Sequence, residues 1–190
     1  MNNVVASFLI VITLNFGSFN LLIINPEPAK TSAYQAFFKD VKAFSSDWES
    51  PLSWNTKYEG NLVAYYFERE TPELNKNSLA GGTVAVFARG INDEVYNAQD
   101  KPVSLPLYLF PVQENVNGVL EYKFASMHGK VQIVIQMQKD IENMFNDQKN
   151  NIQFRYFILP DALLKQHKIS KEEAKKLSYN KILEILQPAA

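Results

Sequence analysis

The sequence predicts a mainly β fold, an antiparallel β-sandwich of about seven or eight short strands with a short helical C-terminal tail. Short segments rich in β-branched and aromatic residues recur along the chain, with Gly, Pro or Asn between them. After Pro160 the apolar residues change to a helical period. The chain has 190 residues, 46% of them apolar, so a single domain can bury enough apolar surface to fold.

The predicted strands are short, and each ends at a turn or at a residue that breaks strands. We expect strands at residues 41–54, 61–68, 83–89, 105–110, 119–125, 131–137 and 152–159. The first bends at Pro51, and Pro106 interrupts the fourth, which is typical of an edge strand or a bulge. His128 and Gly129 separate the fifth from the sixth, so these two strands are predicted to form a hairpin.

Two segments between the strands have a weaker helical pattern. Residues 71–79 are predicted to form a short helical turn, with Thr71 as its N-cap and Pro72 as its first residue. Residues 140–151 are polar and rich in Asn, so we expect a loop there, or at most one turn around Ile141 and Phe145.

The C-terminal tail, at about residues 161–187, carries the clearest helix signals. Ser170 and Glu173 have the spacing of a capping box, in which each side chain satisfies a backbone N–H of the first turn. Ser178 is a candidate N-cap for a second helix with one apolar face. That face consists of Tyr179, Ile182, Ile185 and Leu186.

The N-terminal segment predicts export. Residues 4–24 carry no charge and form an apolar run that is long enough to cross a bilayer. Thr31 and Ala33 supply the small residues of a cleavage site, so we expect residues 1–33 to be a signal peptide, with an uncleaved membrane anchor as the alternative. Residues 34–190 then form a single exported domain, in the periplasm, at the cell surface or outside the cell. Only a retained N-terminal segment would connect it to the membrane.

Composition argues against several kinds of chemistry. The chain has no cysteine, which excludes disulfides, thiolate nucleophiles and sulfur-ligated metals. His128 and His167 are far apart in sequence and are interpreted as a turn residue and a surface residue. We therefore predict no catalytic residues, no metal and no cofactor. A net charge of -1 disfavours nucleic acid as a partner.

Aromatic residues on or beside the predicted strands are the candidate contact residues for a ligand or a partner. They are Trp54, Tyr58, Tyr66 and Tyr108. Aromatic rings also fill sandwich cores, and core packing is the main alternative for this group, with Trp48 and Tyr156 as the strongest core candidates. Arg155 is charged among apolar neighbours, so we expect it to point out of the sheet or to pair with an acid such as Asp47.

Several short motifs, in this order, resemble an exported Bacteroidota protein family of unknown function, whose β-rich C-terminal domain often follows a lipoprotein signal or a collagen-like repeat. The matching segments are Ser46-Asp47-Trp48, Thr71-Pro72-Glu73-Leu74, residues 82–87, Leu105-Pro106, Gly129-Lys130-Val131, residues 154–160 and Ser178-Tyr179. The lipid-bearing cysteine of that family is absent here. Asp161 stands where glycine often follows the proline, which indicates a helix directly after the last strand.

The predicted function is that of a non-catalytic module of the cell envelope or the extracellular space, acting through protein or surface contacts. A carbohydrate-binding or adhesion module with exposed Trp and Tyr is the alternative, and an enzyme is the third class. The expected partner is accordingly an envelope protein or a glycan.

Overall fold

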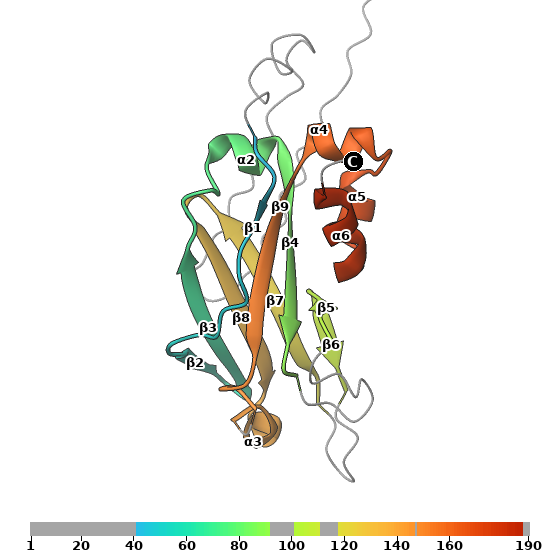
Figure 1. The fold of residues 1–190 in the computed structure, drawn as a ribbon. Helices are drawn as coiled ribbons and strands as arrows, with labels where there is room; N and C mark the ends of the chain where they lie inside the picture. The colour runs from blue at the N-terminus through green and yellow to red at the C-terminus, as the bar shows by residue number, and fades with distance from the viewer. Residues whose placement is uncertain (1–40, 92–100, 111–117, 147, 188–190) are drawn as a thin grey trace, which may run out of the picture. The chain divides into compact units, whose positions relative to one another are not determined.

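The computed structural model describes residues 41–91, 101–110, 118–146 and 148–187. Within these ranges nine strands form two antiparallel sheets, which confirms the mainly β prediction (Figure 1). The predicted signal or anchor, residues 1–33, lies outside the described residues. In the part that is described, no helix is long and apolar enough to cross a membrane.

The first sheet has four strands in the order β1-β9-β4-β5. They are β1 (Phe44–Ser45), β9 (Gln153–Pro160), β4 (Gly82–Arg89) and β5 (Val103–Ser104). The long pair β4 and β9 forms its centre. The tail helices α4 (Asp161–Gln166), α5 (Lys171–Ala174) and α6 (Tyr179–Leu186) lie on its outer side (Figure 1).

The second sheet has five strands in the order β2-β3-β8-β7-β6. They are β2 (Asn55–Glu59), β3 (Leu62–Glu70), β8 (Lys130–Gln138), β7 (Leu120–Met127) and β6 (Leu107–Leu109). Strands β7 and β8 form the predicted hairpin, in which Met127 is opposite Lys130 and Gly129 has a φ of 76°. A positive φ is adopted readily only by glycine, so this turn explains why Gly129 stands there.

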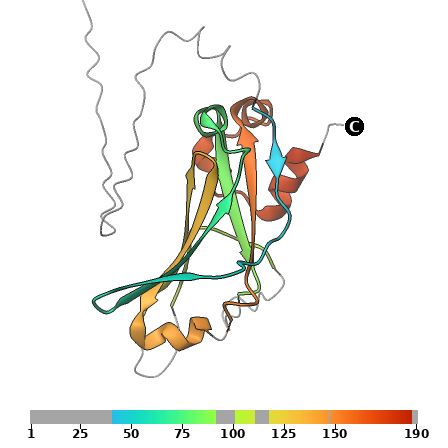
Figure 2. The ribbon, with the colours of Figure 1, turned by 90° about the vertical axis from the view of Figure 1, so that its left-hand side faces the viewer.

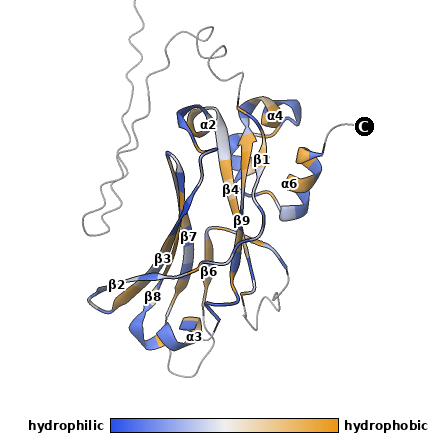
Figure 3. Cartoon of the chain, turned by 60° about the vertical axis from the view of Figure 1, so that its left-hand side comes forward, coloured by the Kyte–Doolittle hydropathy of each residue, from blue (hydrophilic) through white to orange (hydrophobic). Residues whose placement is uncertain are grey.

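The main core lies between the two sheets. Alternate residues of β3, β8 and β7 point into it, including the fully buried Tyr122, Ile133 and Ile135. A second apolar cluster lies between the four-stranded sheet and the helices, where Ile182 packs near Phe87 and Phe157. Strands β4 and β9 are therefore buried on both faces, and they are orange along most of their length in Figure 3. Figure 2 shows the three resulting layers from the side.

The structure differs from the prediction in two segments near the N-terminal end of the domain. Residues 41–54 contribute only the short strand β1 and an isolated bridge between Glu49 and Phe154, so this segment follows the edge of β9 without forming a long strand. Strand β2 was not predicted, because three of the five residues in its sequence NTKYE are of types depleted in strands. It forms by pairing along β3.

The predicted strand at residues 105–110 is reduced to β6, which begins directly after Pro106, and strand β5 at Val103–Ser104, just before it, was not predicted. Strand β5 pairs with β4 of the first sheet, whereas β6 pairs with β7 of the second. Proline lacks the N–H that a continuous ladder needs. Strand β6 is an edge strand, as the proline indicated, and β5 lies at the edge of the other sheet.

The shorter helices close the ends of the sandwich. Helix α2 (Lys76–Ala80) is capped by the side chain of Asn75, which accepts from the N–H groups of Asn77 and Ser78, so the predicted N-cap at Thr71 was wrong. Residues 139–146 form the 3-10 helix η1 (Lys139–Ile141) and α3 (Glu142–Asn146) at the opposite end (Figure 1). Ile141 and Phe145 are buried there, and the helical segment is longer than the single turn that was the most predicted for it.

The tail helices follow their sequence signals closely. The capping box of Ser170 and Glu173 is present, and the Ser178 hydroxyl accepts from the N–H of Lys181. Helix α4 begins at Asp161, immediately after β9, as the residue after Pro160 indicated. Ile182 and Ile185 are buried, and Ile182 belongs to the apolar cluster against the four-stranded sheet, so the tail is docked on the domain.

Candidate functional site

The outward side of the five-stranded sheet is the candidate contact surface, because none of the described helices covers it (Figures 1 and 2). Opposite residues of an antiparallel pair point to the same side of the sheet. The register of β3, β8, β7 and β6 therefore defines this surface, which we call the open face. Its members include Tyr66, Glu68, Glu70, Tyr108, Glu121, Lys123, Lys130, Gln132, Val134 and Gln136.

At one end of the open face, β3 and β8 are linked by charged side chains. Lys130 Nζ lies 2.8 Å from Glu68 Oε2 and 3.5 Å from Glu70 Oε1. The Gln132 amide donates to Glu68 Oε1 at 3.2 Å. These groups are partly exposed, so they hold one another in place while their remaining donors and acceptors are open to solvent.

At the other end, β6, β7 and β8 form a second polar group. Lys123 forms an ion pair with Glu121 and lies 3.5 Å from Gln136 Oε1. A hydrogen bond to Glu121 raises the pKa of Tyr108 above its ordinary value. Tyr108 is 49% exposed. The open face thus combines internally compensated charges with amide and hydroxyl groups, which suits recognition by hydrogen bonds better than recognition by net charge.

The structure does not bring the four candidate aromatic residues together. Tyr66 and Tyr108 share the open face, but they lie on β3 and β6 with two strands between them. At the usual strand spacing that separation is about 14 Å. Tyr58 is opposite Val63 and so belongs to the other side of the sheet. These positions do not form a continuous aromatic row.

Trp54 packs into the core. Its ring makes edge contacts with Phe67, Phe145 and Phe154, at centroid distances of 5.4, 5.5 and 6.2 Å. Edge-to-face geometry at these distances is favourable for aromatic pairs. The half-buried Trp54 therefore connects both sheets to α3. This is the core-packing alternative of the sequence analysis.

Tyr58 belongs to a polar cluster at the α3 end of the sandwich. Its hydroxyl donates to Glu142 Oε1 at 3.0 Å, and the hydroxyl of Tyr65 lies 2.5 Å from the same oxygen. The hydrogen bond to Glu142 raises the pKa of Tyr58, and burial together with that carboxylate raises the pKa of Tyr65. Both phenols are held protonated, so they act as donors that anchor α3. Tyr65 and Glu142 were not identified from the sequence, because nothing in it indicates that they meet.

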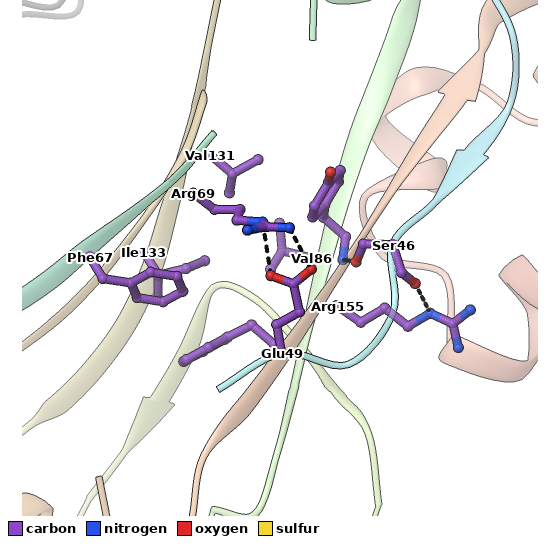
Figure 4. Close-up of a pocket in the computed structure, with 10 residues that line it drawn as sticks. Ser46, Glu49, Phe67, Arg69, Val86, Val131, Ile133 and Arg155 are labelled. Carbon is purple, nitrogen blue, oxygen red and sulfur yellow. Dashed lines mark hydrogen bonds and ion pairs between the residues drawn. The ribbon is translucent and has the colours of Figure 1, made fainter. Parts of the chain in front are cut away.

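A small cavity of about 20 Å³ lies between the sheets. Its lining includes Phe67, Val86, Ile133 and Tyr156, with the Glu49–Arg69 ion pair at its mouth (Figure 4). A cavity of this volume holds about one water molecule. No group of three or more metal-ligating side chains is found among the described residues.

Arg155 points out of the four-stranded sheet, away from this cavity (Figure 4). Of the two predicted arrangements, the pairing with Asp47 is not formed, and no described carboxylate lies within 4.0 Å of the guanidinium. Its partners are neutral: the carbonyl of Ser46 at 2.7 Å, the hydroxyl of Ser45 at 2.6 Å and the hydroxyl of Tyr179 at 2.5 Å. The two histidines are exposed and separate, with His128 in the β7–β8 turn and His167 after α4.

A signal for the open face is present in the sequence. Residues 131–138 read VQIVIQMQ, in which every second residue is Gln except Val134, and the residues between them are apolar, which is the period of a half-buried strand. Comparison with known proteins gives no further guide to the site. The chain matches no protein-family model, and the searches of curated proteins and of solved structures find no match.

Proposed function

We propose that the chain is an exported, non-catalytic module that binds a partner through the open face of its five-stranded sheet. The observation that carries this proposal is the difference between the two sheets. Helices α4 to α6 cover the outer side of one sheet, whereas the described residues leave the other uncovered. The uncovered side holds ordered donors and acceptors, such as those of Gln132 and Glu68, on the rigid pair β3 and β8.

The arrangement favours a protein or surface partner over a saccharide. A flat carbohydrate platform needs aromatic rings close enough to stack on one ligand. Tyr66 and Tyr108 are about three strand spacings apart, and the ring of Trp54 is engaged in the core. Amides and compensated ion pairs, by contrast, are typical of the polar parts of protein interfaces.

Site-specific photo-crosslinking on isolated cell envelopes tests the proposal. A photoreactive amino acid replaces Gln136 on the open face in one variant and the exposed Glu172 on α5 in a matched control. We expect a discrete protein adduct from position 136 and none from position 172. The substitutions Tyr108→Ala and Gln132→Ala should each weaken the adduct, because both remove groups from the open face.

Two results would contradict this proposal. Equal adducts from both positions would mean that the open face has no special role. Retention on purified envelope polysaccharide, lost in Tyr108→Ala, would assign the face to carbohydrate recognition instead.

Export is tested separately from binding. The uncharged run at residues 4–24 and the motifs shared with the exported Bacteroidota family both support it. Mass spectrometry of the protein from its native host should show a mature chain that begins near Tyr34. The intact chain in the membrane fraction would identify an anchor, and the intact chain in the cytosol would contradict export.

A further inference from the structure

We propose that Arg89 and Arg155, on the outer side of the four-stranded sheet, form a binding site for a phosphate monoester group. The two residues lie on β4 and β9. Phe87 is opposite Arg155 and Arg89 is opposite Gln153, so the arginines are diagonal neighbours on one side of the sheet. Diagonal neighbours of an antiparallel pair are about 7–8 Å apart. This site is on the opposite sheet from the open face and does not depend on the function proposed for that face.

The guanidinium of Arg155 is held in a fixed orientation. Nε donates to the Ser46 carbonyl, Nη2 donates to the Ser45 hydroxyl and Nη1 donates to the Tyr179 hydroxyl. These contacts fix the plane of the guanidinium. The group has five N–H donors, so one N–H on Nη1 and one on Nη2 remain available to a ligand. The orientation is thus set before any ligand arrives.

Arg89 is positioned by different contacts. Its Nε donates to Gln153 Oε1 at 2.7 Å, and its guanidinium carbon lies 4.6 Å from the centre of the Trp48 ring. Both Nη groups have no hydrogen-bond partner among the described residues. Trp48 in turn contacts Tyr179, with 5.6 Å between the ring centres. Trp48 and Tyr179 therefore connect the two arginines in one cluster.

The cluster has two positive charges and no described counter-charge. Every salt bridge of the described residues lies elsewhere, and none includes Arg89 or Arg155. Arginine remains protonated at any physiological pH, so these charges cannot be relieved by loss of a proton. The Tyr179 hydroxyl accepts from Arg155, which leaves its own proton available to donate to a ligand.

These features select a doubly charged oxyanion. A phosphate monoester carries about -1.5 to -2 charge at pH 7 and three strong acceptor oxygens. Guanidinium forks match phosphate and carboxylate geometry, but a single carboxylate balances only one of the two charges. Two arginines and one phenol supply donors for all three oxygens. The chemical class that fits is therefore a phosphorylated small molecule or headgroup bound through its terminal phosphate.

The test is a titration of the purified protein with glycerol phosphate, followed by amide NMR shifts and by thermal unfolding. Glycerol, sodium acetate and sodium chloride at matched ionic strength are the comparison solutes. We expect saturable shifts at β4, β9 and the start of α6, and a rise in unfolding temperature, because a ligand that binds only the folded state stabilises it. Binding should weaken below about pH 6, where the monoester gains a proton and the arginines do not.

Arg89→Gln and Arg155→Gln should each weaken binding about tenfold or more, which is the usual effect of losing a charged hydrogen-bond partner. Arg69→Gln, on the other sheet, is the matched control and should bind as the unmodified protein does. Because Arg155 also orders the segment at Ser46, Arg89→Gln provides the test if Arg155→Gln does not fold.

Three results would overturn the proposal. The first is an equal response to glycerol phosphate and sodium chloride. The second is equal binding of acetate, which would make this a carboxylate site. The third is an equal loss of binding in Arg69→Gln, which would reduce the effect to overall charge.

Discussion

The guanidinium of Arg69 on β3 forms a bidentate ion pair with the carboxylate of Glu49, which lies beside β9. Nε is 2.8 Å from Oε2, and Nη2 donates to Oε1 at 2.9 Å. Because β3 and β9 belong to different sheets, this ion pair joins the two layers at one edge of the sandwich (Figure 4). It also covers the mouth of the small cavity lined by Phe67 and Val86.

We predict that this ion pair contributes modestly to stability. Both side chains are substantially exposed, so a double-mutant cycle of Glu49→Gln and Arg69→Gln should give a coupling of about 0.5–1 kcal/mol, near the top of the range for surface pairs because the contact is bidentate. The coupling should shrink in high salt. Urea unfolding at two salt concentrations measures both quantities, and a coupling that salt leaves unchanged would contradict this description.

The cluster of Tyr58, Tyr65 and Glu142 predicts a loss of stability at alkaline pH. Both phenols have pKa values raised above the ordinary value of 10.0 in the folded state. The folded state therefore holds their protons more tightly than the unfolded chain does. The resulting contribution to the free energy of unfolding is complete below about pH 10 and is lost as the pH rises further. Free energies of unfolding measured at a series of pH values should fall above that point.

Tyr65→Phe separates this effect from general alkaline unfolding. The variant lacks the more buried of the two phenols, so its stability should fall less steeply with pH. Tyr66→Phe is the matched control, because the Tyr66 hydroxyl has no hydrogen bond to a described residue. If the two variants have the same pH profile, the cluster is not the origin of the alkaline loss.

Gly90 is predicted to be far less replaceable than Gly129. Both have a positive φ, of 79° and 76°, so alanine at either position should cost about 1–2 kcal/mol of backbone strain. A Cβ at Gly90 would also lie 2.2 Å from the carbonyl oxygen of Asn151, whereas nothing lies within 4 Å at Gly129. Gly90→Ala should therefore cost about 1–3 kcal/mol more than Gly129→Ala. Equal urea unfolding midpoints for the two variants would contradict the close approach of Gly90 to the Asn151 carbonyl.

The docked tail should be part of the cooperative unit. Ile182 is fully buried against the four-stranded sheet, so Ile182→Ala should cost about 2–4 kcal/mol. Ser178→Ala should cost about 1 kcal/mol through loss of the cap. Glu184→Ala, on the exposed side of α6, is the control and should change stability by less than about 0.5 kcal/mol. Deletion of residues 178–190 should lower the unfolding midpoint sharply, and an unchanged midpoint would mean that the helix is not docked.

Local sequence signals determined the elements whose stabilising contacts are close in the chain. The capping box needs only Ser170 and Glu173, which are three residues apart, and the β7–β8 hairpin needs a two-residue turn with Gly129. The β-formers of β3 and β9 also match the segments predicted as strands. For the capping box and the hairpin, the favourable interaction is available before the rest of the domain folds, whereas β3 and β9 were predicted from their β-forming side chains and pair with the distant strands β8 and β4.

Tertiary structure decided the features that depend on a distant partner. Strand β2 has weak β propensity and forms because its backbone pairs with that of β3. Trp54 is a core residue because α3 and both sheets bring Phe67, Phe145 and Phe154 around it. Arg155 points out of the sheet, one of its two predicted arrangements, and contacts Ser45 and Tyr179, which are 110 and 24 residues away, so its partners are neutral and the predicted acid is not among them. Periodicity reports which side of a strand a residue occupies, but only the packing of the layers decides what lies opposite it.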